Sequence, residues 1–229
     1  EAMSKLKNFD TGSLLQKNMI FMDYLQNGVT IKFFVKGEEQ SSIVRLIDYQ
    51  NVKSNSFYVV NQLTFLENGN NRRPDIILIN GLPLVLMELK SPAKDEVGVE
   101  NAYHQIRNYM QDIPSIFYYN AICVISDLST NKAGTITSGL DRFMEWKTKD
   151  GNYEDTAYAS FETFYEGMFQ KERLLDILKN FILFSGVSNS RFKVLAGYHQ
   201  YFAVRKAIEK AKVATKTDGK GGVFWHTQG

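Results

Sequence analysis

Residues 71–92, NRRPDIILINGLPLVLMELKSP, constrain the fold of this chain more than any other stretch. Residues 76–79 form a continuous apolar run, and a second mostly apolar run covers 84–90, so both are expected to be buried strands. The Asn-Gly pair at 80–81 can turn the chain between them, and Pro83 restricts the backbone at the entry to the second strand. The stretch therefore predicts two successive strands in the interior of the protein.

Three charged residues, Asp75, Glu88 and Lys90, accompany these apolar strands. An unpaired buried carboxylate costs roughly several kcal/mol, so charges placed here indicate a site. Because successive side chains alternate across a strand, one face of the second strand is expected to carry Leu84, Leu86, Glu88 and Lys90. Two apolar positions precede two charged ones on that face, so the strand is expected to leave the core at a cleft.

The chemistry of these charged groups is specific. Two carboxylates and a backbone carbonyl form an all-oxygen site for a hard cation, Mg²⁺ before Ca²⁺. A neighbouring lysine can orient or deprotonate a water molecule, and the metal can stabilise charge that builds on a phosphate during attack. The combination predicts hydrolysis of a phosphodiester.

The pattern Pro-Asp at 74–75 followed by Glu-Leu-Lys at 88–90 resembles the PD-(D/E)xK nuclease motif. Together with GLPLV at 81–85, it resembles more narrowly the N-terminal nuclease domain of type I restriction enzyme R (motor) subunits. The resemblance covers most of the chain, from about residue 48 onward.

This resemblance implies a role for each residue of the motif. Asp75 and Glu88 would bind the metal ion, with the backbone carbonyl of Leu89 as a third ligand. Lys90 would position the attacking water, so the catalytic residues would be Asp75, Glu88 and Lys90, with Mg²⁺ as the cofactor. Related nucleases often carry a further ligand on an early helix, where Asp23 is the only acidic candidate.

Residues 97–112 carry apolar side chains at helical spacing and are expected to form an amphipathic helix. Gln105 and Tyr109 lie one turn apart on its expected edge. The pair matches the QxxxY element of the same nuclease group, which implies contact with DNA or support of the metal ligands. The residues alone, without the motif before them, favour an edge of the core for Tyr109 and a surface polar group for Gln105.

Periodicity predicts further elements along the chain. Strands are expected over 29–35, 42–49, 56–65, 121–126 and 143–147, and helices over 13–26, 162–168, 170–184 and 197–213. Strand, helix and strand over 84–126 form the crossover expected of a parallel pair. The fold class implied is α/β: a restriction-endonuclease-like core with a mixed central sheet flanked by helices.

The C-terminal part resembles a different module. Residues 225–229, WHTQG, resemble the segment immediately before the phosphate-binding loop of superfamily 2 motors. Residues 198–204 resemble the segment that precedes such a motor, which implies Gln200 as an ATP contact; an ordinary surface glutamine is the alternative. We therefore expect a nuclease domain over 1–185 and, over 186–229, a linker and the truncated start of an ATP-dependent motor domain. No complete Walker loop is present, so this chain alone is not expected to hydrolyse ATP.

Composition narrows the class of protein. The 229 residues are 44% hydrophobic and contain no apolar run of about 18 residues, so a globular protein without a membrane span is expected. The single cysteine, Cys123, lies in an apolar run, and no signal peptide is visible, so a reduced residue in a cytoplasmic protein is expected. The net charge of +2 does not by itself indicate nucleic acid.

Two functions from different classes fit these observations. The first is a metal-dependent DNA endonuclease domain of a type I restriction enzyme R subunit, a type I site-specific deoxyribonuclease. The resemblance implies that it cuts double-stranded DNA after ATP-driven translocation, together with methyltransferase and specificity subunits. The alternative is a catalytically inactive nuclease-fold module for DNA binding or subunit docking.

Overall fold

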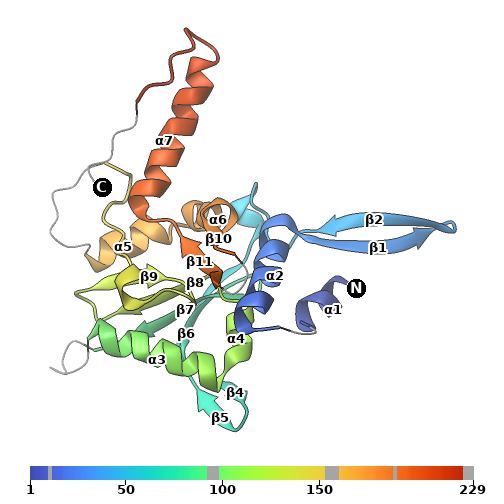
Figure 1. Ribbon diagram of the computed structural model, residues 1–229, viewed down its shortest axis with the longest axis vertical. Coiled ribbons are helices and arrows are strands. Elements are labelled where there is room, and N and C mark those ends of the chain that lie inside the picture. Colours follow the sequence, from blue (N-terminus) through green and yellow to red (C-terminus); the bar gives the residue numbers. More distant parts are fainter. Residues whose placement is uncertain (10–11, 92–97, 153–159, 188–189, 224–229) are drawn as a thin grey trace.

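The computed structural model describes residues 1–9, 12–91, 98–152, 160–187 and 190–223 (Figure 1). Its centre is a five-stranded sheet in the order β3-β6-β7-β8-β9. These strands are β3 (Phe57–Val60), β6 (Asp75–Ile79), β7 (Leu82–Leu89), β8 (Ile122–Ser126) and β9 (Asn131–Gly134). β7 and β8 are parallel and the other neighbours are antiparallel, so the predicted mixed central sheet is confirmed.

The predicted strand pair of residues 71–92 forms as β6 and β7, joined by the Asn80-Gly81 turn. The parallel crossover to β8 passes through α3 (Val99–Asp112) and α4 (Pro114–Tyr118). Ile122–Ser126 are all buried, as expected of a strand covered on both faces. Strand, helix and parallel strand therefore follow one another as the sequence predicts.

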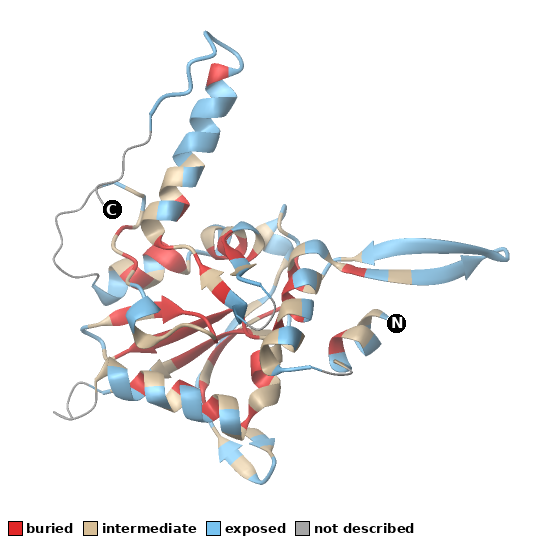
Figure 2. Ribbon diagram, viewed as in Figure 1, coloured by how far each residue is buried: buried red, intermediate tan, exposed pale blue. Residues whose placement is uncertain are grey.

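Helices cover both faces of the sheet, and each face has its own hydrophobic cluster. On one face α3 and α4 pack on Ile76, Leu86, Cys123 and Ile125. On the other face α2 (Leu14–Asn27), α5 (Phe161–Met168) and α6 (Lys171–Asn180) pack on side chains such as Ile77, Val85, Met87 and Val124. Figure 2 shows the buried residues concentrated in the central strands and in the helix faces against them.

The helix predicted over 13–26 is α2. Ser13 begins it through a capping box: its hydroxyl accepts from the backbone N–H of Gln16 (3.3 Å), whose side chain accepts from the N–H of Ser13 (2.7 Å). The strand predicted over 29–35 is β1 (Val29–Val35), which pairs with β2 (Glu38–Val44) in a hairpin that projects from the body (Figure 1).

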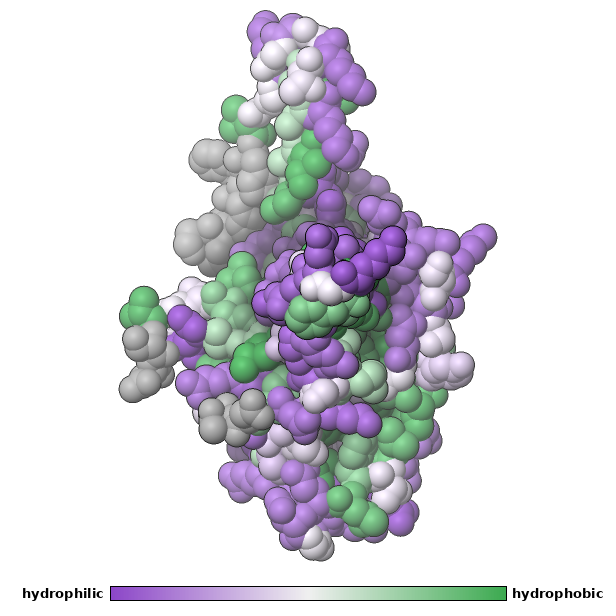
Figure 3. Space-filling model, turned by 90° about the vertical axis from the view of Figure 1, so that its right-hand side faces the viewer, coloured by the Kyte–Doolittle hydropathy of each residue, from purple (hydrophilic) through white to green (hydrophobic). Residues whose placement is uncertain are grey.

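The β1–β2 hairpin differs from the prediction in its second strand, which was expected over 42–49. Lys36 and Gly37 have positive φ angles of 53° and 88°, so the chain reverses directly after β1 and pairs from Glu38 onward. Figure 3, which looks onto this side of the molecule, shows mixed hydrophobic and hydrophilic side chains.

The remaining elements are short. They are α1 (Ala2–Lys7), the 3₁₀ turns Val52–Ser54 and Leu140–Arg142, β4 (Phe65–Glu67), β5 (Asn70–Arg72), β10 (Ile182–Ser185) and β11 (Phe192–Leu195), besides the longer α7 (Tyr198–Ala214). β4 pairs with β5 and β10 with β11, each as an antiparallel hairpin. Within the described ranges, no helix combines the length and apolarity needed to cross a bilayer.

Several predicted elements are wrong in extent. The helix over 170–184 ends at Asn180, and residues 182–185 pair instead with 192–195. The strand over 56–65 is interrupted by a turn at Gln62, whose φ is +50°. The strand over 143–147 is absent apart from one bridge between Met144 and Ala133. Residues 127–137, a polar segment rich in Ser, Thr and Asn, contain β9, which the ladder to β8 holds extended despite its weak strand propensity.

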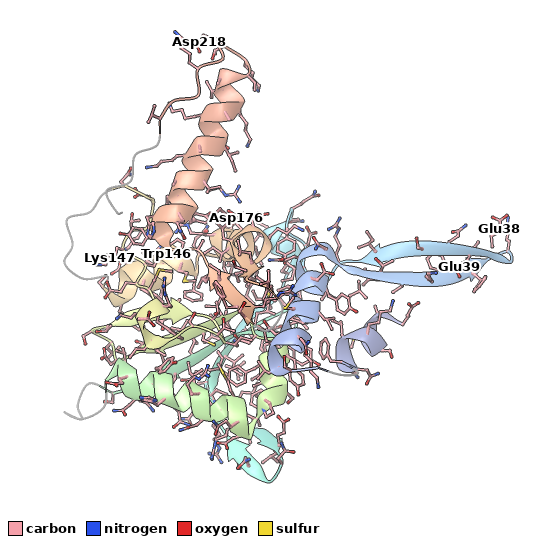
Figure 4. The ribbon with its side chains drawn as sticks, in the orientation of Figure 1. Glu38, Glu39, Trp146, Lys147, Asp176 and Asp218 are labelled. Carbon is pink, nitrogen blue, oxygen red and sulfur yellow. The ribbon has the colours of Figure 1, made fainter. Side chains whose placement is uncertain are left out.

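The base of α7 is anchored to the body. Trp146 packs against the rings of Tyr198, Tyr201 and Phe202, and Asp176 on α6 accepts from the hydroxyl of Tyr201 (2.9 Å). Figure 4 labels Trp146 and Asp176 near the start of α7. The domain boundary expected at 185/186 stays a prediction, and the chain around it forms the β10–β11 hairpin.

Candidate active site

One cleft of about 500 Å³ is lined by Asp75, Glu88 and Leu89 of the nuclease motif. Lys90 is not among its lining residues and is connected to it through the contact with Glu88. The cleft lies where β6 begins and β7 ends, with α3 and the β4–β5 hairpin contributing to its wall. Its lining residues are Gln62, Asn71, Arg72, Arg73, Asp75, Glu88, Leu89, Gln105 and Tyr109. The predicted cleft at the charged end of β7 is therefore present, and both carboxylates reach it from neighbouring strands.

Asp75 is the first residue of β6 and pairs in register with Met87, next to Glu88. Its Oδ1 accepts a hydrogen bond from the backbone N–H of Gln62 at 2.7 Å. The N–H of Leu63 also bonds the carbonyl oxygen of Pro74 at 3.0 Å. The turn after β3 thus fixes both residues of the Pro-Asp pair, which gives Gln62 a structural role that its sequence context does not reveal.

Glu88 is held on both of its carboxylate oxygens. Its side chain is only 12% exposed; Oε1 lies 2.6 Å from Nζ of Lys90, and Oε2 accepts from the hydroxyl of Tyr109 at 3.0 Å. An ionised carboxylate in such a site needs charge-assisted hydrogen bonds to offset the loss of water. Lys90 and Tyr109 supply them and fix the direction in which Glu88 faces the cleft.

Tyr109 both packs in the hydrophobic core and contacts Glu88. It is 7% exposed and belongs to the hydrophobic cluster of Leu86 and Ile106, and its hydroxyl also reaches Glu88. Burial, and next the negative charge of Glu88, raise the pKa of Tyr109 well above its ordinary value. The hydroxyl therefore stays protonated and donates to Glu88. Gln105, one turn earlier on α3, lines the cleft.

The alternation expected along β7 fails at one position. The ladder between β6 and β7 shifts register between Ile77 and Leu78, so Ile77 opposes Val85 and Leu78 opposes Pro83. Leu84 consequently packs in the same cluster as Val85, while Leu86 belongs to the cluster on the α3 face. The bulge adds one residue to β7 and leaves Leu86 and Glu88 on the Tyr109 side.

The donors gathered in the cleft fit a hard cation. Asp75, Glu88 and the carbonyl of Leu89 offer only oxygen, the preference of Mg²⁺, which usually keeps several water ligands. In the ranges that the structure describes, no cluster of three or more His, Cys, Asp or Glu side chains is arranged to hold a metal. Asp23 does not line the cleft; it is exposed on α2 and accepts from Asn27 at 2.7 Å.

The β4–β5 hairpin is tied to the helices beside the cleft by contacts that the sequence did not single out. Nε of Arg72 lies 2.7 Å from Oδ2 of Asp112, the last residue of α3, and Asn70 donates to the carbonyl oxygen of Asp112 at 3.3 Å. Glu67 accepts from the hydroxyl of Ser115 at 2.7 Å. The only sequence signal is the Asn-Gly turn at 68–69 followed by two arginines before the motif.

Gln200 is distant in sequence from this cleft and does not line it. Its Oε1 accepts from the N–H of Gly197 at 3.0 Å, which caps the start of α7, and its side chain borders a separate hollow of about 490 Å³. Its role as an ATP contact stays a prediction. The motor-like residues 225–229 lie outside the described residues.

Comparison with known proteins assigns the chain to a family. The family model for the type I restriction enzyme R protein N terminus matches residues 1–142. The chain is 36% identical over 228 residues to the type I restriction enzyme HindI endonuclease subunit of Haemophilus influenzae, covering 96% of the chain and 22% of that protein. It is 33% identical over 248 residues to a putative type I restriction enzyme MjaIXP endonuclease subunit of Methanocaldococcus jannaschii, covering 97% of the chain and 23% of that protein. The chain thus spans less than a quarter of the length of these relatives. It belongs to the family of type I restriction enzyme R protein N termini.

Proposed function

We propose that this chain is the metal-dependent endonuclease domain of a type I restriction enzyme R subunit. The observation that carries the proposal is the environment of Glu88, whose carboxylate is held by Lys90 and Tyr109 in a cleft that it shares with Asp75. A carboxylate needed only for stability would not require a second carboxylate and an open cleft beside it. Membership of the R protein family supports DNA as the substrate.

The motif residues of β6 and β7, Lys90 directly after β7, and two residues of α3 each have a role in the proposed hydrolysis. Asp75, Glu88 and the carbonyl of Leu89 would hold Mg²⁺, which supplies positive charge to stabilise the phosphate during attack. Lys90, with Nζ 2.6 Å from Oε1 of Glu88, would orient the attacking water. Tyr109 keeps the Glu88 carboxylate directed into the cleft. Gln105 would contact the DNA beside it.

The family also supports a setting for this activity. We propose that the chain acts in the cytoplasm within a longer subunit, with a linker and the start of its ATP-dependent motor over residues 186–229 and with Gln200 contacting ATP. Methyltransferase and specificity subunits would supply the recognised DNA sequence. Cleavage would then follow translocation and would need no sequence-specific contact from this domain.

Metal dependence gives the first test. Nicking of supercoiled plasmid by the 229-residue chain, separated from the motor that would couple cutting to translocation, is expected to require Mg²⁺ and to be abolished by excess EDTA. The measurement is the fraction of nicked plasmid against time on a gel. Nicking that continues at an undiminished rate in EDTA would contradict the proposed metal site.

A further inference from the structure

Arg73 is an exposed cation in the candidate active site that the nuclease motif does not use. It follows β5, precedes Pro74 and lines the cleft two residues before Asp75. Its guanidinium forms no hydrogen bond or ion pair with any residue in the part of the chain that the structure describes. In particular, it is not paired with either carboxylate of the cleft.

Among the residues that the structure describes, two further cations lie at or beside the cleft, and both are already engaged. Arg72 pairs with Asp112, and Lys90 pairs with Glu88. Because both of these charges face a carboxylate partner, their attraction for a further anion is reduced. Of these three described cations, Arg73 therefore carries the unpaired positive charge.

The backbone around Arg73 is fixed on both sides. On the N-terminal side, β5 pairs with β4, and Arg72 and Asn70 are bonded to Asp112. On the C-terminal side, the carbonyl oxygen of Pro74 accepts from the N–H of Leu63. An arginine on such a segment loses less conformational freedom on binding than one in a loose loop, because only its side chain must become ordered.

We propose that Arg73 binds a phosphate of the DNA strand that lies in the cleft. This inference rests on the proposed nuclease function and names a substrate-binding residue for it. DNA must bring phosphates close to Asp75 and Glu88, whose charges repel it. The planar guanidinium donates two parallel hydrogen bonds to a phosphate and offsets that repulsion. A phosphate contact carries no sequence information. It therefore suits a domain that cuts DNA while other subunits recognise the DNA sequence.

The test is binding of duplex DNA to the 229-residue chain, measured by fluorescence anisotropy in EDTA, where metal-dependent cutting cannot interfere. Arg73→Ala is expected to weaken binding about tenfold at low salt and to lower the slope of log K against log [salt] by about 0.9, the value for one phosphate. Two duplexes of unrelated sequence are expected to show the same loss. Arg73→Lys is expected to keep the salt slope and to lose only part of the affinity.

Arg45→Ala is the matched control, because it removes the same charge from an exposed residue that does not line the cleft. Thermal unfolding of each variant verifies the fold.

Equal affinities for Arg73→Ala and Arg45→Ala, or no DNA binding by the unmodified chain, would overturn the inference. Selective loss in Arg73→Ala together with metal-independent nicking would uphold the phosphate contact and reject the proposed metal mechanism. Metal-dependent nicking with unchanged binding by Arg73→Ala would reject only the role of Arg73.

Discussion

Replacing Lys90 with alanine is expected to lower the rate of DNA cleavage by about 10²- to 10⁴-fold, the usual contribution of a group that orients or deprotonates the attacking water. The Nζ atom of Lys90 lies 2.6 Å from Oε1 of Glu88. Glu88 and Asp75 both line the cleft, which is where such a water would be needed. DNA binding is expected to change little, because Lys90 is already paired with Glu88. The measurement is the rate of plasmid nicking in Mg²⁺ beside binding of the same DNA.

The chain offers a closely matched control for this variant. Lys147 also pairs with a glutamate two residues earlier: its Nζ lies 3.1 Å from Oε2 of Glu145. Glu145, unlike Glu88, does not line the cleft, and Figure 4 labels Lys147 beside Trp146. Lys147→Ala breaks the same kind of ion pair at the same spacing and is expected to cut DNA at the normal rate. Equal activities for Lys90→Ala and Lys147→Ala would remove Lys90 from the mechanism.

The second large effect concerns stability. Lys193 is 2% exposed, and its Nζ donates to Oδ1 of Asn18 (3.0 Å) and to the carbonyl oxygen of Asn120 (2.7 Å). Among the described residues no carboxylate pairs with it. Burial lowers the pKa of Lys193 to about 7 in the folded protein, from an ordinary value near 10.5. Burying the charged form is thus unfavourable at low pH.

The direction of the pH dependence follows from proton counts. Between pH 7 and the unfolded pKa, Lys193 is increasingly neutral in the folded state and protonated in the unfolded state. The unfolded state then binds more protons, so the free energy of unfolding rises with pH, by up to about 1.4 kcal/mol per unit. Cys123 has the opposite effect on the free energy of unfolding, but only near pH 9 and above. Burial raises its pKa to about 12 in the folded protein, so at such pH the unfolded state loses this proton first. The effect of Lys193 on the free energy of unfolding is therefore best measured between pH 7 and about 8.5.

Lys193→Met is expected to remove most of this rise between pH 7 and about 8.5. Urea unfolding at several pH values measures it, because linear extrapolation gives the free energy of unfolding at each pH. Lys53→Met, a change of the same type at an exposed lysine, is the control and is expected to keep the unmodified slope. An unchanged slope in Lys193→Met would show that Lys193 stays charged in the folded state.

The sequence predicts the centre of the fold because local signals there agree. Residues 76–79 are uniformly apolar, the Asn-Gly pair turns the chain, and the helix predicted over 97–112 separates two apolar runs, so β6, β7 and β8 follow from pattern and connection length. The meeting of Glu88 with Tyr109 was also predictable in outline, because α3 directly follows β7 in the crossover.

Features decided by tertiary contacts were not predictable. β9 has the composition of a loop and is extended because β8 supplies its hydrogen bonds. Leu84 packs on the other face of the sheet because β7 contains a bulge. No residue type in β7 indicates that bulge in the sequence. Residues 182–185 continue an apolar helical pattern and form a strand because residues 192–195 pair with them. The hydrogen bond from Gln62 to Asp75 comes from the backbone N–H of Gln62, so the identity of the Gln62 side chain does not indicate it.

The central claim is that Asp75 and Glu88 form the DNA-cutting site of a type I restriction enzyme, and Asp75→Asn in the full-length subunit tests it most directly. The asparagine can still accept from Gln62, so the turn is preserved while the negative charge is lost. In the complex assembled with methyltransferase and specificity subunits, this variant is expected to hydrolyse ATP normally and to lose DNA cleavage by at least about 10³-fold, as expected for a metal ligand. Asp48→Asn is the control: Asp48 is an exposed turn residue whose Oδ1 accepts from the backbone N–H groups of Gln50 and Asn51. The complex that carries this control variant is expected to cleave DNA at the normal rate. Unimpaired DNA cleavage by Asp75→Asn would contradict the nuclease account and would favour a docking role for this domain.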